Sequence, residues 1–161
     1  MDKYLITKEE YEKLKKALDV AKERTRKATK DKADAGAGQD AWHDENFKLG
    51  IVEEAKWKRQ EEELKAIVRN VQIIEPVEQA DTAQIGNGVR IEYDNGEKLE
   101  FVLGGYYSGA IMSDKVSIYS PVGEAVLGAR EGESRTFKIG KEEIRIKIKK
   151  ILLPSNVRRS L

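Results

Sequence analysis

The fold is decided at residues 36–47, which read Gly-Ala-Gly-Gln-Asp-Ala-Trp-His-Asp-Glu-Asn-Phe. Glycines destabilise helix interiors and favour caps and turns, so a helix that reaches Gly36 should end there. On either side of this stretch, apolar residues recur at spacings of three and four, which predicts two amphipathic helices. We therefore expect the chain to turn back on itself at this bend.

The helix before the bend should begin at a capping box formed by Thr7 and Glu10. Its narrow stripe consists of Tyr11, Leu14, Leu18, Ala21, Thr25 and Ala28. The stripe after the bend stops before Pro76 and consists of Phe47, Ile51, Glu54, Trp57, Glu61, Leu64, Ile67, Val71 and Ile74. Stripes this narrow are typical of a two-helix seam. Each helix would span roughly 30 residues, about 45 Å, and the two would form an antiparallel coiled-coil finger.

Beyond Pro76 the apolar period changes from that of a helix to two, which predicts strands. Strands are expected near residues 89–93, 99–103, 116–119, 136–139 and 144–151, with Asn95-Gly96 as a tight hairpin turn. Ser120 can cap a short helix, with Pro121 in its first turn and Gly128 at its end. The predicted fold is α+β: a finger over residues 1–75, a linker over 76–83, and an antiparallel sheet domain with a short helix over 84–161.

The composition narrows the class of protein. Of 161 residues, 39% are hydrophobic and 37% are charged, and the net charge is +1, which does not suggest a protein that coats nucleic acid. The chain has no cysteine, no apolar run long enough for a membrane span, and no signal-peptide pattern at its N-terminus. These features predict a soluble, cytoplasmic protein with no membrane partner.

Charge is divided unevenly along the finger. Residues 13–32 carry nine Lys or Arg and three Asp or Glu, whereas residues 33–54 carry six Asp or Glu and one Lys. Asp40, Asp44 and Glu45 are candidate magnesium ligands, because Mg²⁺ prefers hard oxygen donors. Asp40 or Asp44 could instead cap the second helix. His43 is the only histidine and is more typical of an exposed spectator than of a general base, while Trp42 could pack into the bend or project from it.

Motifs for a self-sufficient active site are missing: the chain has no GxSxG, no HExxH and no phosphate-binding loop with lysine. The segment 116–128 reads Val-Ser-Ile-Tyr-Ser-Pro-Val-Gly-Glu-Ala-Val-Leu-Gly. It is similar to the I-S-x-x-S-P-[IVL]-x-x-A-L-[IL]-G segment of the Gre family of bacterial transcript-cleavage factors. With the finger and its acidic end, the resemblance covers nearly the whole chain and implies an FKBP-like C-terminal domain.

The bend resembles the family's tip motif G-D-L-[SK]-E-N-A-E-Y less closely. Glu45-Asn46 match the family's Glu-Asn, but Trp42 stands where the family has its aspartate. The resemblance implies Glu45 as the first acid, with Asp44 and then Asp40 as candidates for the second. Trp42, His43 and Asn46 would make further contacts at the tip.

The resemblance also implies partners and a cofactor. The C-terminal domain would dock on the rim of the secondary channel of bacterial RNA polymerase through Tyr119, Ser120 and Pro121. The finger of a monomeric protein would reach the nascent RNA 3′ end, where Glu45 and Asp44 would help to hold a Mg²⁺ ion shared with the polymerase. The protein would stimulate cleavage of backtracked RNA without itself being an enzyme.

Three other functions fit parts of the sequence. A Gre paralogue could occupy the same channel and inhibit transcription, which the missing aspartate favours. An FKBP-like peptidyl-prolyl isomerase would need an aromatic-lined pocket, for which the candidates are Tyr93, Phe101, Tyr106, Tyr107, Tyr119 and Phe137. A coiled-coil holdase or scaffold would bind its clients without polymerase and would not depend on the tip.

Overall fold

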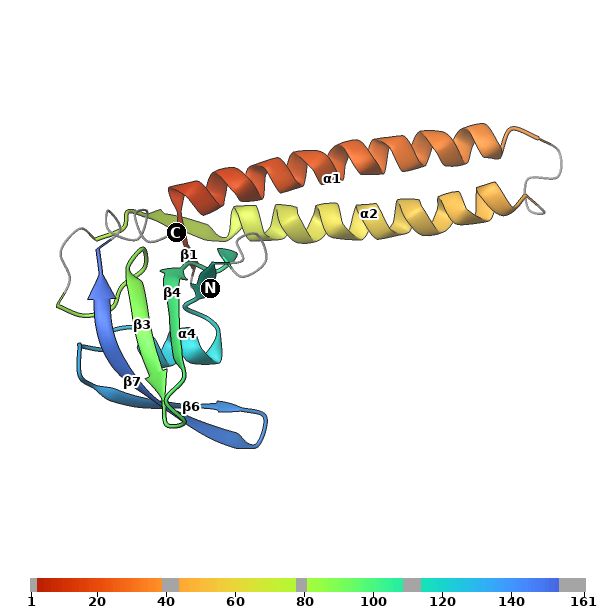
Figure 1. Ribbon diagram of the computed structural model, residues 1–161. Helices are drawn as coiled ribbons and strands as arrows, with labels where there is room; N and C mark the ends of the chain where they lie inside the picture. The colour runs from red at the N-terminus through yellow and green to blue at the C-terminus, as the bar shows by residue number, and fades with distance from the viewer. Residues whose placement is uncertain (1–2, 39–43, 78–80, 109–113, 154–161) are drawn as a thin grey trace. The chain divides into compact units, whose positions relative to one another are not determined.

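The computed structural model describes residues 3–38, 44–77, 81–108 and 114–153 (Figure 1). Its elements in chain order are β1 (Tyr4–Thr7), α1 (Lys8–Ala35), α2 (Glu45–Arg69), β2 (Val71–Ile74), β3 (Gly88–Tyr93), β4 (Lys98–Gly104), β5 (Lys115–Ser117), α4 (Pro121–Val126), β6 (Ser134–Ile139) and β7 (Glu142–Leu152). The predicted order, a helical hairpin followed by a sheet domain that carries the short helix α4, is confirmed. No helix in the described ranges is long and apolar enough to span a membrane.

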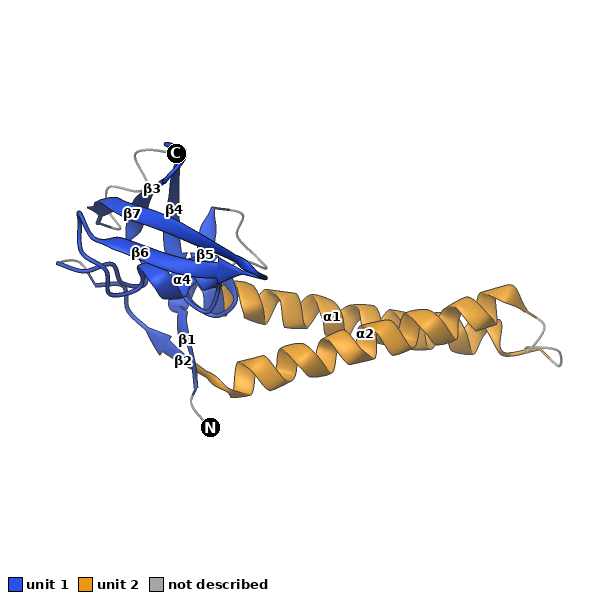
Figure 2. Ribbon diagram, turned by 90° about the horizontal axis from the view of Figure 1, so that it is seen from below, with its two compact units in different colours: residues 1–11, 72–161 blue, residues 12–71 orange. Residues whose placement is uncertain are grey.

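The chain divides into two compact units (Figure 2). Residues 12–71 form the hairpin unit, and residues 1–11 together with 72–161 form the sheet unit. The predicted finger of residues 1–75 is thus longer at both ends than the hairpin unit. Both excess segments contain strands, because β1 and β2 pair with each other in a separate two-stranded sheet.

Strand β2 replaces the end of the second helix that the apolar stripe predicted. Helix α2 ends at Arg69, and the backbone N–H of its C-cap, Asn70, donates to the Ile67 carbonyl oxygen at 2.9 Å. Val71, Ile73 and Ile74 are β-branched, and such side chains favour strands over helices. The apolar stripe therefore continues past the end of α2 into β2, although the backbone changes from helix to strand there.

The hairpin unit consists of α1 and α2 running side by side in opposite directions (Figure 1). The predicted stripe on α1 is the buried one, since Leu14, Leu18, Ala21 and Ala28 are all buried. Helix α1 ends at Ala35, directly before the predicted stop at Gly36, whose N–H donates to the Lys32 carbonyl oxygen at 2.9 Å. On α2 the buried residues are Leu64 and, unexpectedly, Glu54.

The main sheet of the other unit has the strand order β5-β4-β3-β7-β6. Strands β3, β4, β6 and β7 pair antiparallel, as predicted, but β4 and β5 pair parallel, so the sheet is mixed. Ten residues separate β4 from β5, which is enough chain for a crossover. In contrast, β3 and β4 are joined by the three-residue loop Asp94-Asn95-Gly96, which is one residue longer than the predicted tight turn and makes the two strands antiparallel. Gly96 has φ +84°, which only glycine adopts readily.

One face of this sheet carries the core. Val89, Ile91, Leu103, Ile146 and Ile148 are fully buried. Helix α4 contributes Val126 to the same cluster. The alternation predicted for β7 is confirmed, because Ile146 and Ile148 are buried while Arg145, Lys147 and Lys149 are exposed.

The predicted capping box at the start of α1 forms, and its glutamate is fully buried in the sheet unit. The Thr7 N–H donates to Glu10 Oε2 at 2.9 Å, and the Glu10 N–H donates to Thr7 Oγ1 at 3.3 Å. The Glu10 carboxylate also accepts from the Gly105 N–H, at 2.9 Å on Oε1, and from Ser108 Oγ. A Cβ at Gly105 would lie 2.5 Å from Glu10 Oε2, so this contact requires glycine.

Candidate functional site

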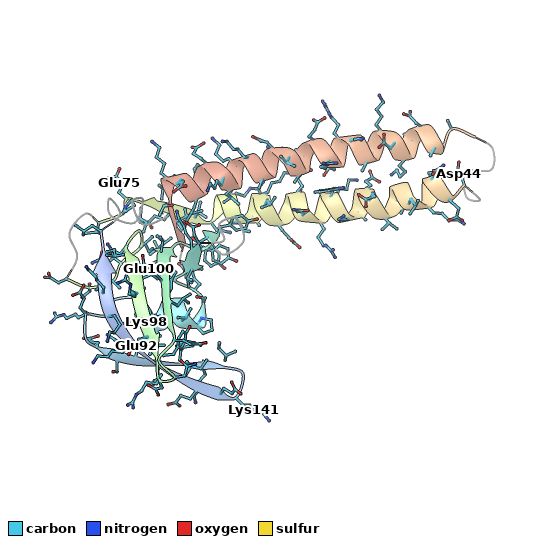
Figure 3. The ribbon with its side chains drawn as sticks, in the orientation of Figure 1. Asp44, Glu75, Glu92, Lys98, Glu100 and Lys141 are labelled. Carbon is cyan, nitrogen blue, oxygen red and sulfur yellow. The ribbon has the colours of Figure 1, made fainter. Side chains whose placement is uncertain are left out.

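The end of the hairpin is built around the start of α2. Asp44 is the N-cap residue of this helix, with an extended backbone, and lies at the hairpin's far end in Figure 3. Its Oδ1 accepts a hydrogen bond of 2.7 Å from the Asn46 backbone N–H. The capping role that the sequence allowed for Asp44 is therefore observed, and it engages one of the two carboxylate oxygens.

Glu45 is the first residue of α2, and its side chain is 81% exposed. Its Oε1 lies 3.0 Å from Lys48 Nζ, one helical turn further on. An exposed ion pair of this kind contributes little stability, so the carboxylate can exchange Lys48 for another cation. The helix N-terminus also favours negative charge at this position.

Asp44, Glu45 and Asn46 thus lie together at the start of α2. Asp40, Trp42 and His43 lie outside the described residues. Within the described ranges, no group of three or more His, Cys, Asp or Glu side chains is arranged to hold a metal ion. The carboxylates of Glu45 and Asp44 have the right donor chemistry for Mg²⁺, but they would leave most of the coordination shell to water and a partner.

A polar cluster in the seam was not predicted as a site. We call Thr29, Lys32, Glu54 and Lys58 the seam cluster. Glu54 Oε1 accepts from Thr29 Oγ1 at 2.8 Å and also lies 3.3 Å from Lys58 Nζ, while Glu54 Oε2 accepts from Lys32 Nζ. The hydrogen bond from Lys32, followed by that from Thr29, lowers the pKa of Glu54 from 4.5 to about 2. The signal available in the sequence was that Glu54 and Glu61 occupy stripe positions that are mostly apolar.

The seam has a second charged position closer to the base of the hairpin. Glu61 Oε1 lies 2.7 Å from Lys65 Nζ. That hydrogen bond lowers the pKa of Glu61, with a further contribution from Thr25, and raises the pKa of Lys65. The stripe residues Glu54 and Glu61 are therefore both ionised parts of the seam.

A hollow of about 330 Å³ lies between α1 and α2. It is lined by Arg24, Lys27, Ala28, Asp31, Asn46, Leu49, Gly50, Glu53 and Trp57. The Arg24 guanidinium lies 5.7 Å from the centre of the Trp57 ring, and Trp57 Nε1 donates to Glu53 Oε2 at 2.9 Å. The hairpin thus places the Arg24 cation beside the Trp57 ring.

The predicted docking residues lie together at the turn from β5 into α4. Ser120 is the N-cap of α4: its Oγ accepts from the Gly123 N–H at 3.1 Å and donates to the Ser117 carbonyl oxygen at 2.7 Å. Pro121 is exposed in the first turn. Tyr119 is 41% exposed and, with Pro121, lines a hollow of about 500 Å³ that reaches Phe137 and Lys138 of β6.

The aromatic residues of the sheet unit do not all gather in one pocket. Phe101 and Phe137 are buried in the core. Tyr4 stacks on Tyr106 with ring centroids 3.9 Å apart, and Tyr119 meets both rings edge-on. The Tyr119 hydroxyl also accepts a hydrogen bond of 3.1 Å from the Leu5 N–H. These rings therefore hold Tyr119 in place at the turn into α4.

Comparison with known proteins agrees with these features. The family described as transcription elongation factor GreA/GreB, C-terminal part, matches residues 78–152. Transcription elongation factor GreA of Thermodesulfovibrio yellowstonii is 32% identical over 140 residues, which cover 85% of this chain and 89% of that protein. Transcription inhibitor protein Gfh1 of Thermus aquaticus is 27% identical over 148 residues, 88% of this chain and 92% of its own.

A solved structure of the transcription factor Gfh1 is 25% identical, covers 94% of this chain and 99% of its own, and has a TM-score of 0.46. The similarity to GreA extends over both the helical hairpin and the sheet unit, at an identity that identifies the family. The chain therefore belongs to the Gre family of transcription elongation factors.

Proposed function

We propose that the protein acts on bacterial RNA polymerase and stimulates cleavage of the backtracked RNA 3′ end with carboxylates at the hairpin tip. The observation that carries this proposal is Glu45, an 81% exposed carboxylate at the start of α2, in the Glu-Asn context of the family. Membership of the Gre family supports the partner, and the secondary channel is the route by which a long hairpin would reach the RNA end.

Glu45 and Asp44 would contribute unequally to binding a metal ion. Glu45 would turn from Lys48 toward a shared Mg²⁺, while Asp44 would offer only the oxygen that Asn46 leaves free. The ion, when bound, would supply Lewis-acid activation of water for attack on the phosphodiester. Because the tip offers so few ligands, tight binding should require RNA phosphate and polymerase carboxylates to complete the shell.

The docking surface in this proposal is the turn at Tyr119, Ser120 and Pro121. Its shape is fixed from within, because Ser120 caps α4 and the tyrosine cluster supports Tyr119. A turn held in this way loses little conformational entropy when it binds a partner. Replacing Ser120 and Pro121 with alanine should therefore weaken binding to polymerase while leaving the hairpin helical.

A second candidate function is occupation of the same channel without cleavage. Two observations favour it: Trp42 stands where the family has its aspartate, and Asp44, two residues later in the sequence, is engaged as an N-cap. The relative from Thermus aquaticus is named a transcription inhibitor. In this case the hairpin would exclude other factors or the RNA end without activating a water molecule.

Transcript cleavage on stalled, backtracked elongation complexes separates the two functions. If the protein stimulates cleavage, Glu45→Gln should abolish the stimulation and still compete for the channel. Asp44→Asn keeps the N-cap, because asparagine caps as well as aspartate, and so tests its charge alone. Glu62→Gln, an exposed position on α2, is the matched control. A wild-type protein that slows elongation and never stimulates cleavage would establish the inhibitory function instead.

A further inference from the structure

The half of the seam nearest the tip contains almost no buried apolar side chain. In α1 after Ala28, and in α2 before Glu54, none of the described residues is buried. The leucines of the seam, Leu14, Leu18 and Leu64, all lie nearer the base. Non-directional apolar contact therefore cannot fix how α2 slides or rotates against α1 close to the tip.

Two close backbone approaches occur in this region. A Cβ at Gly50 would lie 2.9 Å from Lys32 Cβ and 3.0 Å from its Cα. A Cβ at Gly36 would lie 2.8 Å from Cε2 of the Phe47 ring. The helices thus come near enough for side chains of one to bond the other. Glycine has no side chain, however, so these approaches do not by themselves select one alignment of the two helices.

The seam cluster supplies the missing directional contacts. Glu54 comes from α2 and is 10% exposed at its side chain, and it receives Thr29 and Lys32 from α1 on separate oxygens. A shift of one helix past the other would break both contacts and leave the buried carboxylate with only Lys58 of its own helix, which is unfavourable. Single polar residues in coiled-coil seams are known to fix register in this way.

We propose that Glu54 is a positioning residue that sets the register of α2 against α1 and thereby places Glu45 and Asp44. Glu45 precedes Glu54 by about 13 Å of continuous helix, at 1.5 Å per residue, so a register shift at Glu54 carries over to the tip. Lys32 lies one turn before Gly36, where α1 stops. The seam cluster thus bonds the two helices within about one turn of the end of α1. The catalytic consequence rests on the proposed function, whereas the register itself does not.

The register can be measured without any activity. The chain has no cysteine, so cysteines placed at the exposed positions Asp34 on α1 and Val52 on α2 can carry one spin-label pair. Glu54→Gln keeps the shape and the Thr29 contact but removes the charge that binds Lys32 and Lys58. We expect a broader distance distribution between the labels in Glu54→Gln than in Glu62→Gln, with helicity retained. Thr29→Val, which removes one donor, should broaden it less.

Cleavage assays then connect register to chemistry. For Glu54→Gln the maximal cleavage rate at saturating factor should fall roughly ten- to a hundred-fold, since small misplacements of catalytic groups have effects of that size. The half-saturating concentration should stay unchanged, because docking resides in the sheet unit. A merely structural role would instead lower helicity and binding together.

Each outcome decides the proposal. A label distribution as narrow in Glu54→Gln as in wild type overturns it, whatever the cleavage rate. Loss of hairpin helicity in both Glu54→Gln and Thr29→Val also overturns it, because Glu54 would then be a general stabiliser. A wild-type protein without cleavage activity refutes the proposed function only, and the label distances still decide the register.

Discussion

The sheet unit and the hairpin unit are stabilised by different kinds of contact. The sheet unit buries a contiguous cluster of large aliphatic and aromatic side chains on one face of five strands. Among the hairpin residues that the structure describes, three leucines, two alanines and one glutamate are buried along the two long helices. The stabilisation from apolar burial scales with area and depends little on direction, whereas a hydrogen bond to a charged group requires a particular distance and angle. The sheet unit should therefore supply stability, and the hairpin should supply placement.

The largest expected effect tests the sheet core. Ile148→Ala should destabilise the sheet unit by about 2–5 kcal/mol, because it removes buried methyl groups and leaves a cavity. Hydrogen exchange of the β3 and β7 amides measures it directly. Ile139→Ala, at a 58% exposed position of the same sheet, is the matched control and should change little. Equal effects at the two positions would mean that the core does not dominate stability.

A smaller effect is expected at the polar contact inside the sheet unit. In the wild type, the Glu10 carboxylate accepts from several donors, among them the Gly105 N–H. In Glu10→Gln, one of the two carboxylate oxygens is replaced by an amide N–H₂, which cannot accept. One buried donor then lacks an acceptor, which costs roughly 1–3 kcal/mol. Urea unfolding followed by far-ultraviolet circular dichroism measures the loss, with the exposed Glu12→Gln as control. A loss no larger than that of Glu12→Gln would contradict the role given to this contact.

Alanine substitutions at Gly50 and Gly38 test how closely the two helices approach each other near the tip. Gly50→Ala gains about 1 kcal/mol of helix propensity but meets the backbone of Lys32, and overpacking of this kind costs about 1–3 kcal/mol. The net result should be mild destabilisation near the tip. Trp42 and Trp57 both lie in the hairpin unit, so tryptophan fluorescence during urea unfolding reports on it alone.

Gly38→Ala is the matched control for that substitution. A Cβ at Gly38 would meet no atom within 4 Å, so its replacement should be neutral or slightly stabilising. If Gly50→Ala stabilises the hairpin as much as an ordinary glycine replacement does, the helices are not in close contact at Lys32.

The smallest expected effect is a pH dependence confined to the hairpin. The pKa of Glu54 is lowered from 4.5 to about 2, so its contribution is complete above about pH 4.5 and is lost as the pH falls toward 2. Glu61 acts in the same direction, since its pKa is also lowered. Thermal melts of the hairpin between pH 7 and pH 2 should show a steeper loss in wild type than in Glu54→Gln. Parallel curves would indicate that Glu54 is not ionised in the seam.

Periodicity predicted the elements but not where the chain changes between units. The stripe through Val71 and Ile74 fits a helix and a strand equally well, because short apolar runs do not distinguish the two. Strand β1 escaped notice since Tyr4–Thr7 gains its stability only by pairing with β2, a partner distant in sequence. The parallel pairing of β5 likewise depends on a crossover that no local pattern encodes.

The candidate site divides in the same manner. Glu45, Asp44 and the Ser120-Pro121 turn were predicted, because caps and family motifs are local signals. Glu54 stood in the predicted stripe, but its partners Thr29 and Lys32 are brought to it only by the pairing of the helices. The positions of Asp40, Trp42 and His43 stay predictions, as these residues lie outside the described ranges.

The buried carboxylate of Glu10 has a consequence for the order in which the chain matures on the ribosome. Its donors Gly105 and Ser108 are synthesised about a hundred residues after β1, and the whole hairpin emerges in between. Local helices form within about a microsecond, far faster than residues are added. The hairpin is therefore expected to fold first, as an insertion within a still incomplete sheet unit, while the N-terminal strand waits for its partners. A nascent chain halted before Gly105 should already resist proteolysis in the hairpin and remain cleavable at Tyr4–Thr7.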